Sequence, residues 1–297
     1  MTNRIILLVL SLAFLTSDCF ADDPHPRTLR VMTYNTWYVF AKGKEQDTGA
    51  KFIQSHSPDV VALQELTNIQ PETLHQLASQ WEHGYSSLLK TSGFSVGLTS
   101  RWPIELIEKR LDKMHHGYLH ANTNGVHYFV VHLSPFDWKV RMREAEVLLS
   151  KINPLLEKNA KIIVLGDFNA HSACDAQWLS KNKTLLEKLR QSDKKNDHVE
   201  NLRDGQFDFS VMKLFLDTKL ADTSEQTVQN TAARRSTFST GIWSDKKTAP
   251  ATGERIDYIL ASPSMLARVK NSSVIREGIV NRISDHYPVI TDFRWTQ

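Results

Sequence analysis

Carboxylates, amides and imidazoles directly follow a series of short apolar runs in this sequence. A polar side chain at the end of a buried strand is held rigidly at the rim of a sheet, where a ligand crevice needs it. Carboxylate and amide oxygens bind hard cations such as Mg²⁺, and an imidazole transfers protons near neutral pH. The residues of this kind are Asn35, Glu65, His132, Asp167, Asn169, Asp257, Asp285 and His286.

Each of these residues, taken alone, has an ordinary structural explanation. Asp167 and Asn169 are typical of a turn that follows a strand, and Asp285 is typical of a turn that precedes one. A single histidine such as His132 is more often a hydrogen-bonded core residue than a catalytic one. Asp257 is different, because a carboxylate between two apolar neighbours in a strand must find a partner or remain costly to bury. The complete ordered set favours a reactive site.

Strand and helix patterns alternate in both halves of the chain around an antiparallel segment. Apolar runs predict strands over residues 29–34, 60–63, 95–99, 104–111, 118–121, 126–132, 161–166, 255–261, 268–274 and 287–293. Helical spacing predicts helices over residues 48–56, 71–81, 138–156 and 211–216. Because no helix separates the strands between residues 85 and 132, those strands are expected to be antiparallel. The pattern predicts an α/β protein with mixed sheets covered by helices.

The composition is that of one globular domain. The chain has 297 residues, of which 41% are hydrophobic and 23% are charged, and this excludes a collagenous or disordered chain. No internal repeat or Gly/Ser linker divides the sequence. A formal net charge of +3 is too small to argue for a nucleic-acid partner by bulk charge. Residues 181–204 are highly charged with nearly balanced signs, which predicts a solvated helix or loop.

The N-terminus has the pattern of a secretory signal peptide. Arg4 precedes an eleven-residue apolar run, Ile5–Leu15, which is too short to span a bilayer, and the small residue Ala21 follows. We expect residues 1–21 to be removed, which leaves a domain of residues 22–297 that is secreted or periplasmic. A buried N-terminal helix or strand is the alternative interpretation of this run.

The cysteine count predicts a protein without disulfides. Removal of the signal peptide takes Cys19 away and leaves Cys174 alone, so neither an internal disulfide nor a disulfide-linked partner is expected. Stability must therefore come from the core or from a bound metal. Beyond residue 22, no apolar stretch is long enough to cross a membrane.

The ordered set of polar residues resembles the endonuclease/exonuclease/phosphatase superfamily, which includes pancreatic deoxyribonuclease, abasic-site endonucleases, neutral sphingomyelinases and inositol polyphosphate phosphatases. The resemblance extends from Arg30–Asn35 to Ser284–Pro288. Supporting stretches are residues 58–65, 99–104 and 131–133. The resemblance implies a four-layer sandwich in which two mixed β-sheets pack face to face and helices cover both outer faces. It also implies a hydrolase that acts on phosphoester bonds.

The resemblance and the residue chemistry assign the same metal ligands. Glu65 and Asp285 supply carboxylate oxygens for Mg²⁺, with Mn²⁺ as the alternative ion. Asn35 lies nearby to hold a metal-bound water or a phosphate oxygen. All three are oxygen donors, which hard divalent cations prefer.

The remaining residues receive roles in proton transfer and charge stabilisation. Asp167 orients or deprotonates the attacking water, whereas Asn169 and His132 donate hydrogen bonds to the phosphoryl oxygens. His286 transfers a proton or stabilises the phosphate, and Asp257 fixes its tautomer by accepting from the other ring nitrogen. The resemblance also places a glutamate partner for the active-site histidine in residues 93–97, which here carry no carboxylate. The proton-transfer role of His132 therefore lacks its expected partner.

Five histidines crowd one stretch and raise the alternative of a zinc site. They are His115, His116, His120, His127 and His132. The stretch has the pattern of strands, whose side chains alternate between faces, so His115 and His116 should point in opposite directions. We therefore expect surface and edge-strand histidines rather than a dedicated zinc site.

Two further groups have both a functional and a structural interpretation. Arg141 and Arg143 begin the long predicted helix, where they either reach an acidic substrate or form a solvated helix face. Trp37, Tyr38 and Phe40 follow the first predicted strand, where they either stack on a base or pack in the core. Neither group identifies a nucleic acid.

The sequence as a whole predicts a secreted, Mg²⁺-dependent phosphoesterase that hydrolyses phosphodiester bonds by metal-assisted in-line attack of water. Nuclease-like activity is favoured, so the expected partner is a phosphoester substrate, with nucleic acid as the leading candidate. The alternative within the same class is a phosphatase or a lipid phosphodiesterase of the sphingomyelinase type. The alternative from another class is a non-catalytic phosphate-binding protein on the same scaffold. Nothing in the sequence sets the oligomeric state.

Overall fold

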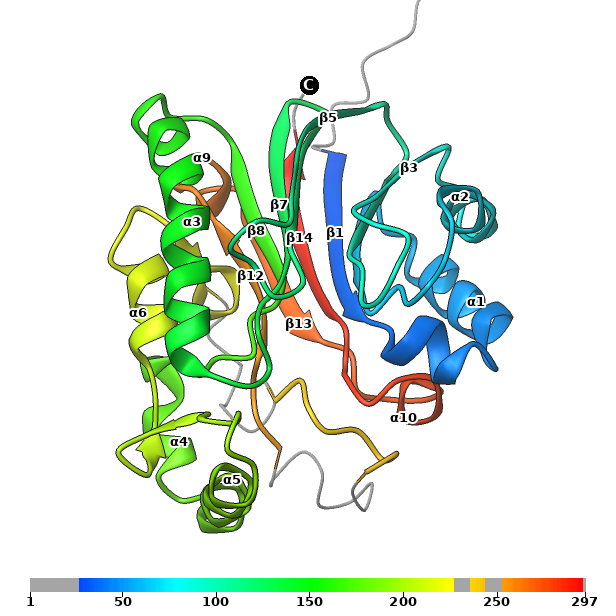
Figure 1. Ribbon diagram of the computed structural model, residues 1–297. Coiled ribbons are helices and arrows are strands. Elements are labelled where there is room, and N and C mark those ends of the chain that lie inside the picture. The colour runs from blue at the N-terminus through cyan, green and yellow to red at the C-terminus, as the bar shows by residue number, and fades with distance from the viewer. Residues whose placement is uncertain (1–26, 227–235, 244–252, 296–297) are drawn as a thin grey trace, which may run out of the picture.

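The computed structural model describes residues 27–226, 236–243 and 253–295, and most of its strands lie in two six-stranded sheets (Figure 1). The first sheet contains β1 (Arg27–Asn35), β2 (Val60–Gln64), β3 (Tyr85–Leu88), β4 (Gly97–Ser100), β13 (Val269–Val274) and β14 (Val289–Trp295). The second sheet contains β5 (Ile104–Arg110), β6 (Tyr118–Thr123), β7 (Val126–His132), β8 (Ile162–Asp167), β11 (Ala221–Asp222) and β12 (Asp257–Ala261). The predicted signal peptide, residues 1–21, lies outside the described residues.

Both sheets are mixed. The strand order is β13-β14-β1-β2-β4-β3 in the first sheet and β11-β12-β8-β7-β6-β5 in the second. Each sheet has one parallel pair, β1 with β2 and β7 with β8, and its other neighbours are antiparallel. A helix connects each parallel pair, as such a connection requires: α1 (Gln46–His56) in the first sheet and α3 (Trp138–Glu157) in the second.

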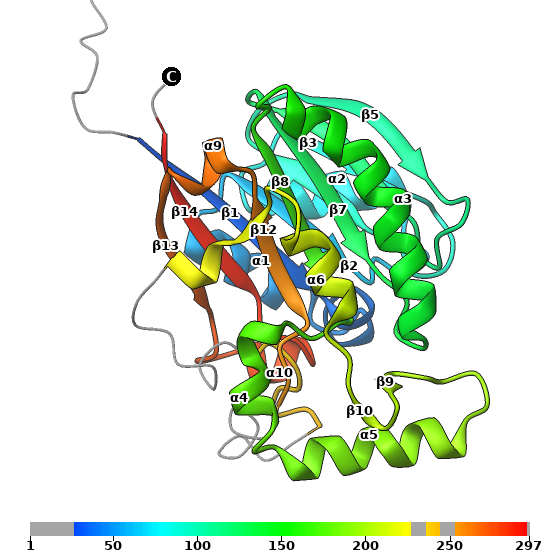
Figure 2. The same ribbon diagram turned by 90° about the vertical axis from the view of Figure 1, so that its left-hand side faces the viewer.

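Helices cover the outer faces of both sheets. Helices α1 and α2 (Pro71–Gln80), with the short α10 (Val280–Ile283), pack on the first sheet, and α3 and α6 (Ser210–Leu216) pack on the second (Figure 1). The predicted four-layer α/β sandwich is therefore confirmed. The remaining elements are η1 (Trp37–Lys42), η2 (Ala173–Asp175), α4 (Ala176–Leu179), α5 (Lys183–Lys195), β9 (Leu202–Arg203), β10 (Gln206–Phe207), η3 (Thr223–Gln226) and α9 (Pro263–Leu266). Helices α4 and α5 lie beyond one end of the sandwich, and the β9–β10 hairpin lies beside α5 (Figure 2).

The alternation of side chains along β1 shows how the core is divided. Leu29 and Val31 lie in the apolar layer between the two sheets, whereas Met32 and Tyr34 lie in the layer under the helices of the first sheet. Successive side chains of a strand point to opposite faces, so Asn35 at the end of β1 faces the space between the sheets. The alternation that builds the core therefore also directs a polar side chain to one end of the layer between the sheets.

The segment between residues 85 and 132 departs from the prediction of one antiparallel series. Strands β3 and β4 pair within the first sheet, whereas β5, β6 and β7 belong to the second. Strands β4 and β5 do not pair, because the chain passes between the stacked sheets at residues 101–103. Strand β3 was not predicted, since it is a short strand at a sheet edge and most of it is polar. Strands β12 and β14 begin two residues later than predicted, at Asp257 and Val289.

The charged residues 181–204 contain both predicted alternatives, a helix and a loop. Helix α5 begins after Asn182, whose side-chain oxygen accepts a hydrogen bond from the backbone N–H of Leu185. Cys174 is exposed and free. Within the described residues, no helix is both long enough and apolar enough to span a membrane.

Candidate active site

The polar residues singled out in the sequence gather at one end of the layer between the sheets. In β8, Ile163 and Leu165 face that layer, so Asp167, two residues further on, faces the same way. The strand register then pairs Asp167 with His132 of β7 on one side and with Asp257 of β12 on the other. Three neighbouring strands of the second sheet therefore each contribute one of these polar side chains.

Asp167 is the centre of the cluster and is 1% exposed. Its Oδ2 accepts a hydrogen bond of 3.0 Å from Asn35 Nδ2 and lies 3.6 Å from His132 Nε2 and 3.8 Å from His286 Nε2. Its Oδ1 accepts a hydrogen bond of 2.9 Å from the backbone N–H of Asn169. Burial and the neighbouring Asp257 carboxylate raise the pKa of Asp167 to about 8.

His286 connects two more carboxylates to this centre. Its Nδ1 lies 2.9 Å from Asp257 Oδ2, and its Nε2 lies 3.9 Å from Asp285 Oδ1. Burial alone would lower the pKa of His286, but the charge of Asp257 and its hydrogen bond outweigh burial and raise that pKa well above its ordinary value. The other oxygen of Asp285, Oδ2, accepts a hydrogen bond of 2.9 Å from the indole N–H of Trp243.

Glu65 joins the cluster from the first sheet. Its Oε1 accepts a hydrogen bond of 3.3 Å from Asn35 Nδ2, and its Oε2 accepts one of 3.2 Å from the backbone N–H of Tyr38. Burial raises the pKa of Glu65, since the charged carboxylate loses water there. All eight predicted site residues therefore lie in one connected network of hydrogen bonds and short charge contacts.

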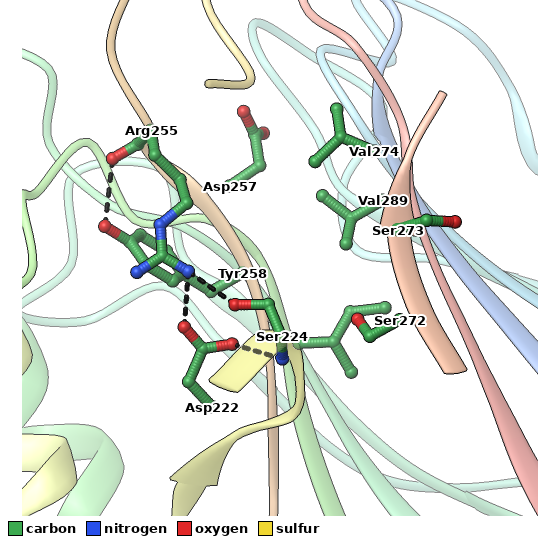
Figure 3. A pocket seen from close by; sticks show the side chains of 10 residues that line it. Asp222, Ser224, Arg255, Asp257, Tyr258, Ser272, Ser273, Val274 and Val289 are labelled. Atoms are coloured by element: carbon green, nitrogen blue, oxygen red, sulfur yellow. Dashed lines mark hydrogen bonds and ion pairs between the residues drawn. The ribbon is translucent and has the colours of Figure 1, made fainter. Parts of the chain in front are cut away.

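The segment that leads into Asp257 is fixed by a buried ion pair. Arg255 Nε lies 2.7 Å from Asp175 Oδ2, and the same guanidinium bonds to Asp222 and to Ser224. Figure 3 shows this guanidinium directed toward Asp222 and Ser224 rather than toward Asp257. Arg255 thus holds the backbone on one side of the strand while Asp257 faces the cluster.

The donor atoms of the cluster fit a hard divalent cation. Four carboxylates, those of Glu65, Asp167, Asp257 and Asp285, lie with two imidazoles, and of these the pKa is raised for His286 but lowered by burial for His132. Within the described part of the chain, Asp257 Oδ1 and Asp285 Oδ1 are buried without a hydrogen-bond partner. The same part contains one group of metal-type side chains, Asp167, Asp257 and His286, whose ligand atoms all lie within 4.8 Å of one another. A bound cation would compensate this excess of buried negative charge.

The histidine-rich stretch differs from the expectation of surface and edge-strand side chains. His116, His120 and His132 are buried. His115 and His116 lie in the turn before β6 with ring centroids 4.3 Å apart, so they do not point in opposite directions. The ring of His116 stacks on that of His132 at 4.2 Å, a contact that sequence spacing does not show. His132 Nδ1 has no hydrogen-bond partner among the described residues, in agreement with the missing carboxylate.

The structure decides part of the interpretation of the arginines of α3 and of the aromatic residues after β1. Arg141 is 2% exposed rather than solvated, and its Nη1 donates hydrogen bonds of 2.8 Å to the backbone oxygen of Ser134 and to Asn201 Oδ1. Arg143 is exposed, as a helix-face residue would be. Phe40 is buried in the core, whereas Tyr38 remains 38% exposed near Glu65.

Trp243 is a site residue that the sequence did not indicate. It is 61% exposed although its indole N–H binds Asp285, and its ring lies 5.8 Å from that of Trp37. Trp37 belongs to the aromatic group noted after the first predicted strand, but Trp243 comes from a distant part of the chain, and no local motif marks it. Only the fold brings them together beside the cluster.

Comparisons with known proteins agree with this arrangement. The model of the Endonuclease/Exonuclease/phosphatase family matches residues 32–286. An AP endonuclease from Archaeoglobus fulgidus has a similar structure, with 17% identity, a TM-score of 0.67 and coverage of 89% of this chain and 99% of that one. The 3′-5′ exonuclease NExo from Neisseria meningitidis has 20% identity, a TM-score of 0.64 and coverage of 90% and 100%.

A third solved structure, of the 3′ phosphatase NExo from Neisseria bound to product DNA hairpin, has 18% identity, a TM-score of 0.64 and coverage of 90% and 100%. A comparison with curated protein sequences gave no match. At these identities the structural similarities establish the fold, and the family follows from the match over residues 32–286.

Proposed function

Because this chain belongs to the endonuclease/exonuclease/phosphatase family, whose members hydrolyse phosphoester bonds, we propose that it is a Mg²⁺-dependent phosphodiesterase with nuclease-like activity. The observation that carries the proposal is the cluster around Asp167, in which the predicted acid, base and metal-ligand residues form one network. The preference for nucleic acid is supported by the similar structures, which include an AP endonuclease and a phosphatase bound to a DNA hairpin.

In the proposed reaction, Asp167 is the group that receives a proton. Its carboxylate accepts hydrogen bonds from Asn35 and Asn169, and these fix its orientation. With a pKa raised to about 8 by burial and by Asp257, it takes up a proton near neutral pH as the attacking water forms a new P–O bond and the ester P–O bond breaks.

His286 supplies a positive charge at the position where negative charge develops. Asp257 holds Nδ1, which leaves Nε2 directed toward Asp167 and Asp285. From that position Nε2 donates a hydrogen bond to a phosphoryl oxygen. Asn169 orients Asp167 through its backbone N–H, which donates a hydrogen bond of 2.9 Å to Oδ1.

Glu65, Asp285 and Asn35 are the residues that would hold the metal ion. When bound, Mg²⁺ neutralises charge on the phosphoryl oxygens and orients the scissile group. The orphaned Oδ1 of Asp285 and the hard oxygen donors of the set support this assignment.

We also propose that the protein is exported and processed near Ala21. The support is the sequence pattern of residues 1–21, a basic start followed by a short apolar run. The proposed domain is therefore residues 22–297, in a secreted or periplasmic location.

The proposed activity is tested by a substrate panel. Purified protein with Mg²⁺ should hydrolyse DNA or RNA together with bis(p-nitrophenyl) phosphate, and Asp167→Asn should be inactive on all of them. Hydrolysis of sphingomyelin alone would instead indicate a lipid phosphodiesterase, and hydrolysis of p-nitrophenyl phosphate alone a phosphatase. Phosphate binding without any turnover would indicate a non-catalytic binding protein and would overturn the proposal.

A further inference from the structure

A cavity of about 210 Å³ lies directly beside the cluster and has no role in the mechanism above. Asn169, whose backbone N–H binds Asp167, forms part of its wall. Other wall residues come from the loop after β7, from α3 and α5, and from the segment before β12, together with His171, Asn201 and Phe238. The cavity therefore begins at a residue of the proposed active site and extends toward α5.

Arg141 places a buried positive charge in the wall of this cavity. Its side chain is 2% exposed, and within the described residues no carboxylate lies within ion-pair distance of it. Its Nη1 donates hydrogen bonds to neutral oxygens, and its Nε has no hydrogen-bond partner in that part of the chain. Burial lowers the pKa of Arg141 to about 10, while the carboxylates of Asp208, Glu144, Asp137 and Asp167 act in the opposite direction from beyond ion-pair distance, so the guanidinium stays charged at neutral pH. Those carboxylates offset part of the cost of burying this charge but do not pair with it, so the guanidinium can still bind an anion directly.

The other charged groups of the wall leave the cavity positive. Glu254 is buried there, where its carboxylate hydrogen-bonds to His171 Nε2 at 2.8 Å and also interacts with the charge of Lys188. Lys188 of α5 lies at the exposed rim, with Nζ 5.9 Å from the ring of Phe238. The wall therefore carries two cations, Arg141 and Lys188, and one carboxylate, that of Glu254. A guanidinium and an ammonium in the wall of one cavity are typical ligands of a phosphoryl group.

We propose that this cavity binds a second phosphoryl group of the substrate, next to the phosphoester that is hydrolysed. The proposal rests on the phosphoester hydrolysis proposed above, since Asn169 is shared by the cavity and the cluster. Arg141 holds the group from inside the wall and Lys188 holds it from the rim. The second phosphoryl group belongs either to the next phosphodiester of a strand or to a terminal phosphate of a small bisphosphate.

Three aryl esters with the same leaving group test the proposal and distinguish these two sources. The first is thymidine 5′-(p-nitrophenyl phosphate), the second carries an additional 3′-phosphate, and the third continues through a 3′-phosphodiester to another thymidine. Wild-type kcat/KM should be at least tenfold higher for the second or third ester than for the first. A preference for the third indicates a strand, and a preference for the second indicates a small bisphosphate.

Variants locate the effect in the cavity. Lys188→Gln and Arg141→Gln should remove the preference while leaving hydrolysis of the first ester within about twofold. Arg141→Lys, which keeps the positive charge, should retain part of the preference for the second or third ester. The matched controls Lys195→Gln on α5 and Arg143→Gln on α3 lie on exposed positions outside the cavity wall and should change nothing. Equal rates on all three esters, or equal losses on all three in both Gln variants, would refute the proposal.

A binding measurement separates failure of this proposal from failure of the proposed activity. With chelator present, inorganic phosphate should raise the Tm of the full chain saturably, and Lys188→Gln should need at least fivefold more phosphate than wild type or Lys195→Gln. If no ester is hydrolysed but this difference is seen, the anion site stands and the proposed activity fails. If phosphate has the same effect on all variants, the cavity is not an anion site. Because Lys188 is exposed, its variant should fold even where Arg141→Gln does not.

Discussion

Asp257 and His286 form one unit, in which the carboxylate determines what the imidazole can do. Asp257 is 3% exposed, and the 2.9 Å contact to His286 Nδ1 is the partner that its burial requires. With Nδ1 held in this way, Nε2 is the ring nitrogen that faces Asp167. Asp257 is thus a positioning residue, since it acts on the reaction through the orientation and charge of His286.

The pairing predicts how substitutions should combine. Asp257→Asn should lower kcat by roughly 100-fold and change KM by less than about threefold, because Asn keeps the shape but no longer stabilises the imidazolium. The double variant Asp257→Asn/His286→Ala should be scarcely slower than His286→Ala alone, since residues that act as a unit are not additive.

The measurement is kcat and KM on an aryl phosphodiester for wild type, both single variants and the double variant. Urea unfolding of Asp257→Asn serves as the control, because a small change in midpoint separates a catalytic loss from a folding defect. If the two losses in rate simply multiply, Asp257 has a separate structural role.

At the residue scale, the partners and burial of some side chains can be predicted from the sequence, whereas those of others cannot. The need of Asp257 for a partner can be read from its two apolar neighbours, and His286 is that partner. The burial of Arg141 cannot be predicted in the same way, because a residue at its position in the helix could face either solvent or a cavity. The stacking of His116 on His132 depends on a turn whose path the sequence does not specify.

The parallel pair β7 and β8 depends on one glycine at its active-site end. Gly166 has a φ of +142°, a conformation that other residues rarely adopt, and it precedes Asp167 directly. A Cβ at this position would lie 2.0 Å from the backbone oxygen of Val131 on β7. The close approach of the two strands therefore requires a residue without a side chain.

Gly166→Ala should destabilise the fold and the site together. We expect a loss of about 2–4 kcal/mol in the free energy of unfolding, from strain and from the forced separation of two strands. Activity should fall as well, because His132 and Asp167 end the two displaced strands. Gly84→Ala is the matched control, since nothing lies within 4 Å of the Cβ that it adds. Urea unfolding that gives equal midpoints for both variants would show that the strands tolerate the separation.

The turn η1 illustrates what sequence patterns do not reveal about elements. All six residues from Trp37 to Lys42 have positive φ, which costs L-residues roughly 1–2 kcal/mol each. The core position of Phe40 offsets part of this cost, and the Tyr38 N–H reaches Glu65 Oε2. The strands were predictable from their apolar runs, but a left-handed turn without glycine has no such pattern.

The whole molecule brings the site together from two sheets. Asn35, Glu65 and His286 come from segments of the first sheet, whereas Asp167 and Asp257 come from the second. Neither sheet alone holds a complete set of ligands and proton carriers. The proposed metal ligands Asn35, Glu65 and Asp285 all come from the first sheet, so the face-to-face packing of the sheets is what adds Asp167 and Asp257 to them and completes the proposed active site.

At the scale of the whole molecule, the resemblance of the ordered motifs to the superfamily predicted the sandwich correctly. Each motif stands at the end of a strand, so the order of the motifs in the sequence indicates the order of the strands along the chain. The assignment of β4 and β5 to different sheets was not predictable, since a short turn serves equally within a sheet or between two sheets. The cavity lined by Lys188 of α5 was also not predictable. The nearly balanced charges of residues 181–204 predict only a solvated helix or loop.

The central claim is that the cluster around Asp167 is a metal-dependent hydrolytic centre, and a titration of turnover with free Mg²⁺ tests it most directly. Wild-type protein should be inactive on bis(p-nitrophenyl) phosphate after exhaustive chelation and should regain activity saturably with Mg²⁺ or Mn²⁺. Glu65→Gln should require at least about tenfold more Mg²⁺ for half-maximal rate, whereas Glu72→Gln, at an exposed position of α2, should match wild type. Full activity after chelation, restoration by Zn²⁺ alone, or the same Mg²⁺ requirement in Glu65→Gln would contradict the account.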